Sequence, residues 1–277
     1  MTFKTILAIV QNTADAERVV CCAAELVSRY EGHLIGLHAE AMPIPYTSSF
    51  GFPDAEFIQA STDINNERSE KLGVVFRTIA EAAGISAEWR SFESFSGDSA
   101  ASGIASARCA DLVVAAQADP NADTGGSADI ETLLFDAGRP VLVVPHSGAC
   151  LSSYRRVLVA WDGSRPAARA VFDALPFILK ANDTEILMID PPEVPPLDEA
   201  GQDIAAALAR HGADVRVHTE KSGGLSKDTV IQNRVAATGA DLLVLGAYSH
   251  SWLREFLFGG VTRSVLQSMP ITAFLSR

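Results

Sequence analysis

Two loops in the second half of the chain carry residues that could bind a polar, anionic ligand. In the first loop, Asp162, Gly163 and Ser164 stand directly after a short apolar run, and Arg165 and Pro166 follow where a helix begins. Ser164 suits the capping position of that helix, and Pro166 suits its first turn. Capping does not explain Asp162, whose carboxylate could accept hydrogen bonds from a base or a ribose. We therefore take Asp162 as a candidate ligand-binding residue.

The second loop spans residues 246–262 and ends where another helix begins. Gly246 would let a second backbone approach closely, while Gly259 and Gly260 precede the helical stretch 261–269. The first N–H groups of a helix have no acceptor within it, so such a start binds anions, and Thr262 adds a hydroxyl. A plain helix cap would use the same residue types. This loop alone leaves both interpretations open.

Both loops belong to the second of two copies of one domain. Residues 111–145 can be laid over residues 241–275 without a gap, and residues 4–12 over residues 155–163. The second register continues through residues 33–39 over residues 184–190. The two copies therefore have the same order of elements, and each serves as an internal control for the other.

Short apolar runs alternate with helical patterns in each copy. Runs without polar alternation indicate strands that are covered on both faces, as in a parallel sheet flanked by helices. The expected strands are residues 5–10, 34–38, 88–92, 112–116 and 141–144, then 157–160, 185–189, 214–218, 242–245 and 271–275. Right-handed helical crossovers between them predict a Rossmann-like α/β sandwich per copy. We place the domains at residues 1–147 and 153–277.

The first copy is longer than the second near residues 41–66. This extra stretch holds Pro43, Pro45, Phe50, Phe52 and Pro53. Its aromatic side chains could cover the mouth of a pocket or a partner surface. We expect instead a loop that packs on its own domain.

Composition and charge narrow the class of partner. The 277 residues are 48% hydrophobic, and no apolar run approaches the roughly 18 residues of a membrane span. The net charge is −12 without a long cluster of Lys and Arg, which argues against nucleic acid or an anionic membrane as the partner. The four cysteines lack zinc-ligand spacing, so we expect reduced thiols. We interpret the protein as cytoplasmic.

The Asp-Gly-Ser turn and the glycine loop together resemble the universal stress protein family in its tandem form. The resemblance covers nearly the whole chain. It implies two tandem Rossmann-like domains of the adenine nucleotide alpha hydrolase-like type, each a five-stranded parallel sheet of order 3-2-1-4-5 with helices on both faces. In the ATP-binding branch of the family, it also implies a nucleotide lying across strands one and four.

The resemblance assigns a role to each candidate residue of the second copy. Asp162 would face the adenosine, Ile189 would border the base, and the ribose and phosphates would lie against Gly246, Ser249, Gly259, Gly260, Val261 and Thr262. Ser249 stands where the ATP-binding pattern has its second glycine, and Gly260 where the pattern usually has serine or threonine. Trp161 is bulky at the expected base edge, where it would either stack on the base or fill the site.

The first copy departs from this pattern at several aligned positions. Gln11 stands for Asp162, Ala116 for Gly246, Asp119 for Ser249, and Asp129-Ile130 for Gly259-Gly260. A carboxylate at position 129 would repel an anion at close range. We therefore expect at most one adenine nucleotide per chain, in the second copy.

Three functions remain open at this point. The leading hypothesis is a nucleotide-responsive stress protein, not an enzyme, whose first copy serves structure and contact with an unidentified protein partner. The alternatives are a nucleotide-free interaction protein of the same fold and a slow nucleotide hydrolase. No catalytic residue or metal ligand can be assigned. The apolar fifth strands, residues 141–144 and 271–275, are expected to pair as an internal pseudo-dimer, and a homodimer is optional.

Overall fold

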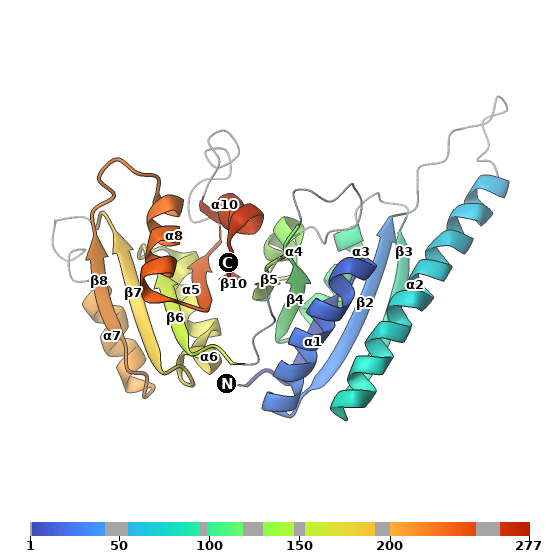
Figure 1. Cartoon of the computed structure of the whole chain (residues 1–277), viewed down its shortest axis with the longest axis horizontal. Coiled ribbons are helices and arrows are strands. Elements are labelled where there is room, and N and C mark those ends of the chain that lie inside the picture. Colours follow the sequence, from blue (N-terminus) through green and yellow to red (C-terminus); the bar gives the residue numbers. More distant parts are fainter. Residues whose placement is uncertain are drawn as a thin grey trace. The chain divides into compact units, whose positions relative to one another are not determined.

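The computed structural model describes most of the chain, and its residues fall into two compact units (Figure 1). The described residues are 2–41, 55–94, 99–118, 130–146, 153–191, 200–247 and 261–277. The N-terminal unit comprises residues 3–116 and 121–139. The C-terminal unit comprises residues 140–277 together with residues 1–2 and 117–120.

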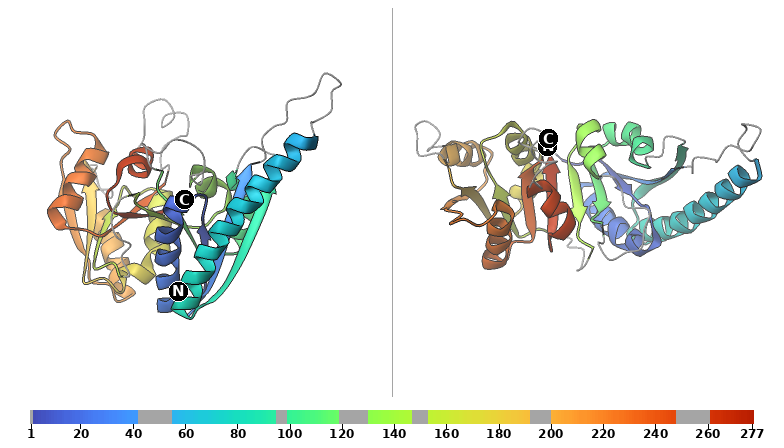
Figure 2. Two further views of the ribbon diagram at one scale, coloured as in Figure 1. Left: turned by 45° about the vertical axis from the view of Figure 1, so that its right-hand side comes forward. Right: turned by 90° about the horizontal axis from the view of Figure 1, so that it is seen from above.

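The N-terminal unit is built on parallel strands in the order β3-β2-β1-β4. These strands are β1 (Thr5–Ile9), β2 (His33–Ala41), β3 (Ser86–Ser94) and β4 (Leu112–Ala116). Its helices are α1 (Thr13–Tyr30), α2 (Ala55–Ala83), α3 (Ser99–Arg108) and α4 (Ile130–Asp136). Helices α1 and α2 pack together, as do α3 and α4. The two pairs cover opposite faces of the strands (Figure 2).

The C-terminal unit repeats this plan, with parallel strands in the order β8-β7-β6-β9-β10. Its strands are β6 (Arg156–Ala160), β7 (Asp183–Ile189), β8 (Arg216–Glu220), β9 (Leu242–Gly246) and β10 (Thr272–Ser276). Its helices are α5 (Arg165–Asp173), α6 (Leu175–Ile178), α7 (Ala200–Arg210), α8 (Lys227–Thr238) and α10 (Val261–Ser268). The predicted α/β fold class and the strand order 3-2-1-4-5 of this copy are confirmed.

Strand β5 (Val141–Val144) belongs to the C-terminal unit, although it closes the first copy in sequence. It pairs antiparallel with β10, in the register Ala273↔Val143, Phe274↔Leu142 and Leu275↔Val141. Both strands are buried along their whole length. The expected pairing of the two fifth strands is therefore confirmed. The division of the chain at residues 147 and 153 stays a prediction.

One repeated contact supports the match between the copies. Asp111 precedes β4, and its Oδ2 accepts hydrogen bonds from the backbone N–H groups of Lys4 (2.8 Å) and Thr5 (2.9 Å). Asp241 precedes β9 and accepts from the backbone N–H groups of Arg155 (2.8 Å) and Arg156 (2.9 Å). In each copy, the same carboxylate thus holds the start of the first strand beside the start of the fourth.

Part of the extra stretch in the first copy is helical, which corrects the expectation of a loop over residues 41–66. Helix α2 begins at Ala55 and has 29 residues, whereas α7 in the second copy has 11. The second half of α2 is held by Leu72 and Phe76, which are buried, and the Phe76 ring lies 5.3 Å from that of Trp89. The first turns of α2 extend past the ends of β2 and β3 (Figure 1). The proline and phenylalanine positions of residues 42–54 lie outside the described residues.

Candidate functional site

The Asp-Gly-Ser turn lies where β6 ends and α5 begins. Asp162 is exposed, and its Oδ1 accepts a hydrogen bond from the backbone N–H of Ser164 at 2.9 Å. Gly163 has a φ of 72°, which other residues rarely adopt. Ser164 then caps α5, because its Oγ accepts from the N–H of Ala167 at 3.3 Å. The cap was predicted. The hydrogen bond from Ser164 gives Asp162 a structural role that the sequence did not reveal.

Gly246 ends β9 and lies directly against the start of α5. A Cβ atom at this position would come within 2.3 Å of the backbone nitrogen of Ala167 and 2.5 Å of the carbonyl carbon of Pro166. The prediction that another backbone approaches Gly246 is thus confirmed. In this structure, the approaching backbone is that of the helix which the Asp-Gly-Ser turn starts. Gly246 therefore sets the position of that turn over the sheet.

The start of α10 contributes Val261 and Thr262. Val261 is half-buried, while Thr262 is only 2% exposed, so its hydroxyl is not on the surface as expected for a phosphate contact. Within α10, Ser264 donates to Asp228 on α8 at 2.9 Å, which fixes one helix against the other. Hydrogen bonds from Ser226 and Ser264 hold the pKa of Asp228 below its ordinary value. The backbone N–H groups at the start of α10 keep the capacity to bind an anion.

Ile189 ends β7 at the same edge of the sheet and is half-buried. The next residue, Asp190, has a φ of 49°, and its Oδ1 accepts a hydrogen bond from the backbone N–H of Ser222 at 3.0 Å. Hydrogen bonds from Ser222 keep the pKa of Asp190 below its ordinary value. Sequence reasoning missed this second carboxylate, although an acidic residue directly after a strand is the same signal that singled out Asp162.

Trp161 lies between β6 and Asp162. Its backbone N–H donates to the carbonyl of Leu187 at 2.9 Å, which continues the pairing of β6 with β7. The side chain is half-buried, and its Nε1 is buried with no acceptor among the described residues. An unpaired buried donor costs about 1–3 kcal/mol. A ligand atom that accepted this hydrogen bond would remove the cost.

Three further candidates lie outside the described residues: Ser249, Gly259 and Gly260.

Three described candidates stand at the ends of neighbouring strands of one sheet: Asp162 after β6, Gly246 at the end of β9 and Ile189 at the end of β7. The structure therefore brings these three to one edge. Among the described residues, no group of three or more His, Cys, Asp or Glu side chains could hold a metal ion.

The first copy differs from the second at the positions aligned with Asp162, Gly246 and Ile189. Gln11 is buried, at 6% exposed, where Asp162 is exposed, and its Nε2 has no partner among the described residues. Ala116 ends β4 where Gly246 ends β9. At the position of Ile189, His38 is buried, and its Nδ1 lies 2.9 Å from the carbonyl oxygen of Val10. Asp119 and Asp129 lie outside the described residues.

A parallel sheet with a turn, a close glycine and a helix start at its carboxyl edge defines a doubly wound α/β domain. Residues 153–277 match the model of the universal stress protein family. These residues therefore belong to the universal stress protein family, and the resemblance seen in the sequence is confirmed for the second copy. No curated protein sequence matches the chain significantly.

The chain is similar in structure to several solved proteins. A universal stress protein from Archaeoglobus fulgidus DSM 4304 superposes with a TM-score of 0.74 at 18% identity, covering 99% of this chain and 96% of that one. A putative universal stress protein from Pseudomonas aeruginosa UCBPP-PA14 gives 0.58 at 18% identity, covering 99% and 93%. A functionally unknown protein from Pseudomonas aeruginosa PAO1 gives 0.59 at 16% identity, covering 99% and 92%. At these identities, the likeness shows the fold, over both copies.

None of the described helices is both long and apolar enough to cross a bilayer.

Proposed function

We propose that the protein is a cytoplasmic, nucleotide-responsive stress protein whose second copy binds one adenine nucleotide, such as ATP, at the carboxyl edge of β6 and β9. The first copy serves structure and contact with a protein partner. The ligand acts as a signal that is bound and released, and its hydrolysis is not the biological role.

The observation that carries the proposal is the coincidence of two features in one copy. The family match covers residues 153–277, and the same residues contain the exposed carboxylate of Asp162 beside the close contact of Gly246 with α5. The aligned Gln11 of the first copy is buried and uncharged. A carboxylate can accept hydrogen bonds from ribose hydroxyls or a base amino group, and it would repel phosphates. This charge favours an orientation with the adenosine at Asp162.

Two further features support a fit to an adenine nucleotide. The buried Nε1 of Trp161 is a donor without an acceptor among the described residues, next to Asp162 in the chain, and adenine carries ring nitrogens that accept hydrogen bonds. The start of α10 supplies backbone N–H groups for phosphate.

A second candidate function is a nucleotide-free interaction protein of the same fold. Two observations favour it: the side chain of Thr262 is buried, and the indole of Trp161 occupies the expected base edge. In that case the nucleotide site has become part of the core of the domain, and regulation passes through protein contacts alone.

Mass spectrometry of small molecules released from the purified, denatured protein separates the two candidates. The proposal expects an adenine nucleotide in an amount of up to one per chain. If no nucleotide is released, ATP should still raise the unfolding temperature of the same preparation. A preparation that releases no nucleotide and shows no thermal shift with ATP contradicts the proposal and supports the interaction protein.

A further inference from the structure

A hollow at the amino ends of the strands in the C-terminal unit has the features of a second ligand site. Its volume is about 520 Å³, within the range of small-molecule sites. It lies where β6, β7 and β9 begin, whereas Asp162 and Gly246 lie where strands end, so the two places are at opposite edges of one sheet. The residues around the hollow are Arg155, Arg156, Asn182, Asp183, Gly239 and Asp241.

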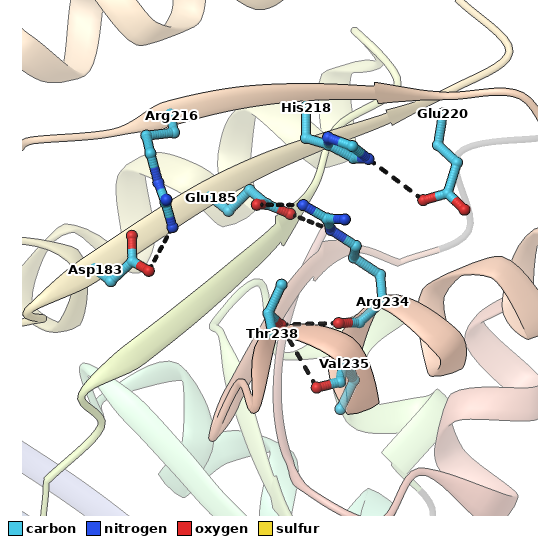
Figure 3. Close-up of polar contacts among 8 residues, drawn as sticks. All are labelled: Asp183, Glu185, Arg216, His218, Glu220, Arg234, Val235 and Thr238. Atoms are coloured by element: carbon cyan, nitrogen blue, oxygen red, sulfur yellow. Dashed lines mark hydrogen bonds and ion pairs between the residues drawn. The ribbon is translucent and has the colours of Figure 1, made fainter.

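The acidic residues of the hollow already have partners. Both carboxylate oxygens of Asp241 accept hydrogen bonds from backbone N–H groups, at 2.8 and 2.9 Å. Asp183 forms an ion pair with Arg216 on β8, with 2.5 Å between Oδ2 and Nη2 (Figure 3). The charge of Asp183 is therefore offset by Arg216, whereas Asp241 keeps its charge but has both oxygens engaged by backbone N–H groups.

The arginines of the hollow, in contrast, have side chains without polar partners in the described part of the chain. Arg155 and Arg156 are both exposed, and neither guanidinium forms a hydrogen bond or an ion pair with any residue that the structure describes. Gly239 leaves room for one of them, because a Cβ there would come within 2.8 Å of Nη1 of Arg156. The amide of Asn182 adds an N–H donor to the same hollow.

The first copy shows that this arrangement is not required by the fold. Lys4, which aligns with Arg155, donates from its Nζ to the carbonyl oxygens of Tyr30 (2.7 Å) and Glu31 (3.1 Å) at the end of α1. Thr5 occupies the place of Arg156. The equivalent cation of the first copy thus holds a helix end, while the second copy has two guanidiniums without a hydrogen bond or an ion pair among the described residues.

We propose that this hollow binds a small molecule through an oxyanion group, a phosphate or a carboxylate, held by Arg155 and Arg156. A guanidinium presents several N–H donors in one plane and pairs with such groups through two hydrogen bonds. Because Arg216 offsets Asp183, the two arginines outweigh Asp241 and leave the hollow with a net positive charge, on a chain whose net charge is −12. This site lies apart from the proposed nucleotide site. The experiments that test it can therefore fail while the proposed function stands, and the reverse.

Amide chemical shifts of the full chain, labelled with ¹⁵N and titrated at low ionic strength, test this site. Inorganic phosphate and citrate are added in separate experiments, which distinguishes phosphate from carboxylate ligands. At least one should give saturable shifts at residues 155, 156, 182 and 239, with a dissociation constant of about 1 mM or lower. Shifts that saturate only around residues 162 and 262, or shifts that do not saturate with either probe, overturn the proposal.

Variants that each remove one positive charge, inside or outside the hollow, provide the control. Arg155→Gln and Arg156→Gln should each weaken binding about tenfold, since each removes a charge-assisted hydrogen-bond donor. Arg210→Gln removes an exposed arginine of the same unit outside the hollow and should leave affinity nearly unchanged. Asp162→Asn should also leave it unchanged. An equal loss in Arg210→Gln would show that only the net charge matters and would contradict the site.

Discussion

Glu185 on β7 and Arg234 on α8 form a two-bond ion pair, with Nε to Oε1 at 2.6 Å and Nη2 to Oε2 at 2.7 Å (Figure 3). The side chain of Glu185 is 9% exposed and that of Arg234 is 23% exposed. Hydrogen bonds between them lower the pKa of Glu185 and raise that of Arg234. The pair thereby fastens α8 to the sheet, and α8 in turn holds α10 through the bond of Asp228 with Ser264.

The first prediction concerns the stability of this pair. Glu185→Gln should lower the free energy of unfolding by about 2–3 kcal/mol, because it leaves the half-buried charge of Arg234 without its counter-ion. Arg216→Gln is the matched control on the neighbouring strand, since it breaks an exposed pair with Asp183 and should cost less than about 1 kcal/mol. Urea unfolding monitored by circular dichroism measures both. Equal losses in the two variants would show that burial of the Glu185 pair contributes nothing.

The pH dependence of stability follows from the same pair. Because folding lowers the pKa of Glu185, its contribution is fully present above the unfolded value of 4.5 and is lost as the pH falls through the folded value below it. The difference in unfolding free energy between wild type and Glu185→Gln should therefore be constant near neutral pH and shrink below pH 4.5. A difference that grew on acidification would have the wrong sign for a lowered pKa.

Gly246→Ala should destabilise the C-terminal unit and displace the Asp-Gly-Ser turn. The new methyl group would lie 2.3 Å from the backbone nitrogen of Ala167, so α5 has to move, and such overpacking costs about 1–3 kcal/mol. Ala116→Gly at the aligned position of the first copy creates no clash and should cost about 1 kcal/mol or less. Thermal unfolding compares the two. Unchanged stability in Gly246→Ala would show that α5 shifts freely over β9.

Hydrolysis of ATP, if it is detected, should be far slower than the median enzyme turnover of about 10 per second. An activated water needs a placed base or a metal ion, and the described residues contain no cluster that could hold a metal. Release of phosphate from ATP, followed over hours with excess Mg²⁺, measures the rate. Turnover near the median would overturn the interpretation of the ligand as a bound signal and show that the protein is a nucleotide hydrolase.

The sequence predicted the strands and the repeat because both depend on local patterns, whereas the strand order came only from the resemblance to the family. Runs of apolar residues become buried strands such as β4, and the spacing of Val19, Ala23, Val27 and Tyr30 places one face of α1 in the core. The predicted strand at residues 214–218 lies two residues too early. Strand β8 begins at Arg216 and is a half-exposed outer strand, so burial gives its sequence no clear signal.

Other features depend on tertiary contacts that no local pattern records. Gly246 was expected to admit a close backbone, but only the packed sheet shows that this backbone is the start of α5. Thr262 has the residue type of a phosphate contact and is nevertheless buried. The first turns of α2 were expected to be loop, because they fall in a stretch that is extra in the first copy and holds several prolines. In the structure their apolar residues Phe57 and Ile64 are exposed, so no buried face marks this part of the helix in the sequence.

Isothermal titration of the nucleotide-free full chain with ATP tests the central claim most directly, through three variants. Wild type should bind one ATP per chain. Asp162→Ala should lower affinity about 10- to 150-fold, by loss of a hydrogen bond to a charged acceptor. Asp162→Asn keeps an oxygen for the N–H of Ser164 and so preserves the turn, but it should still weaken binding, because the carboxylate charge is lost. Gln11→Ala should bind as wild type does. Two equivalent sites per chain, or a loss of affinity in Gln11→Ala with none in the Asp162 variants, would contradict the assignment of the site to the second copy.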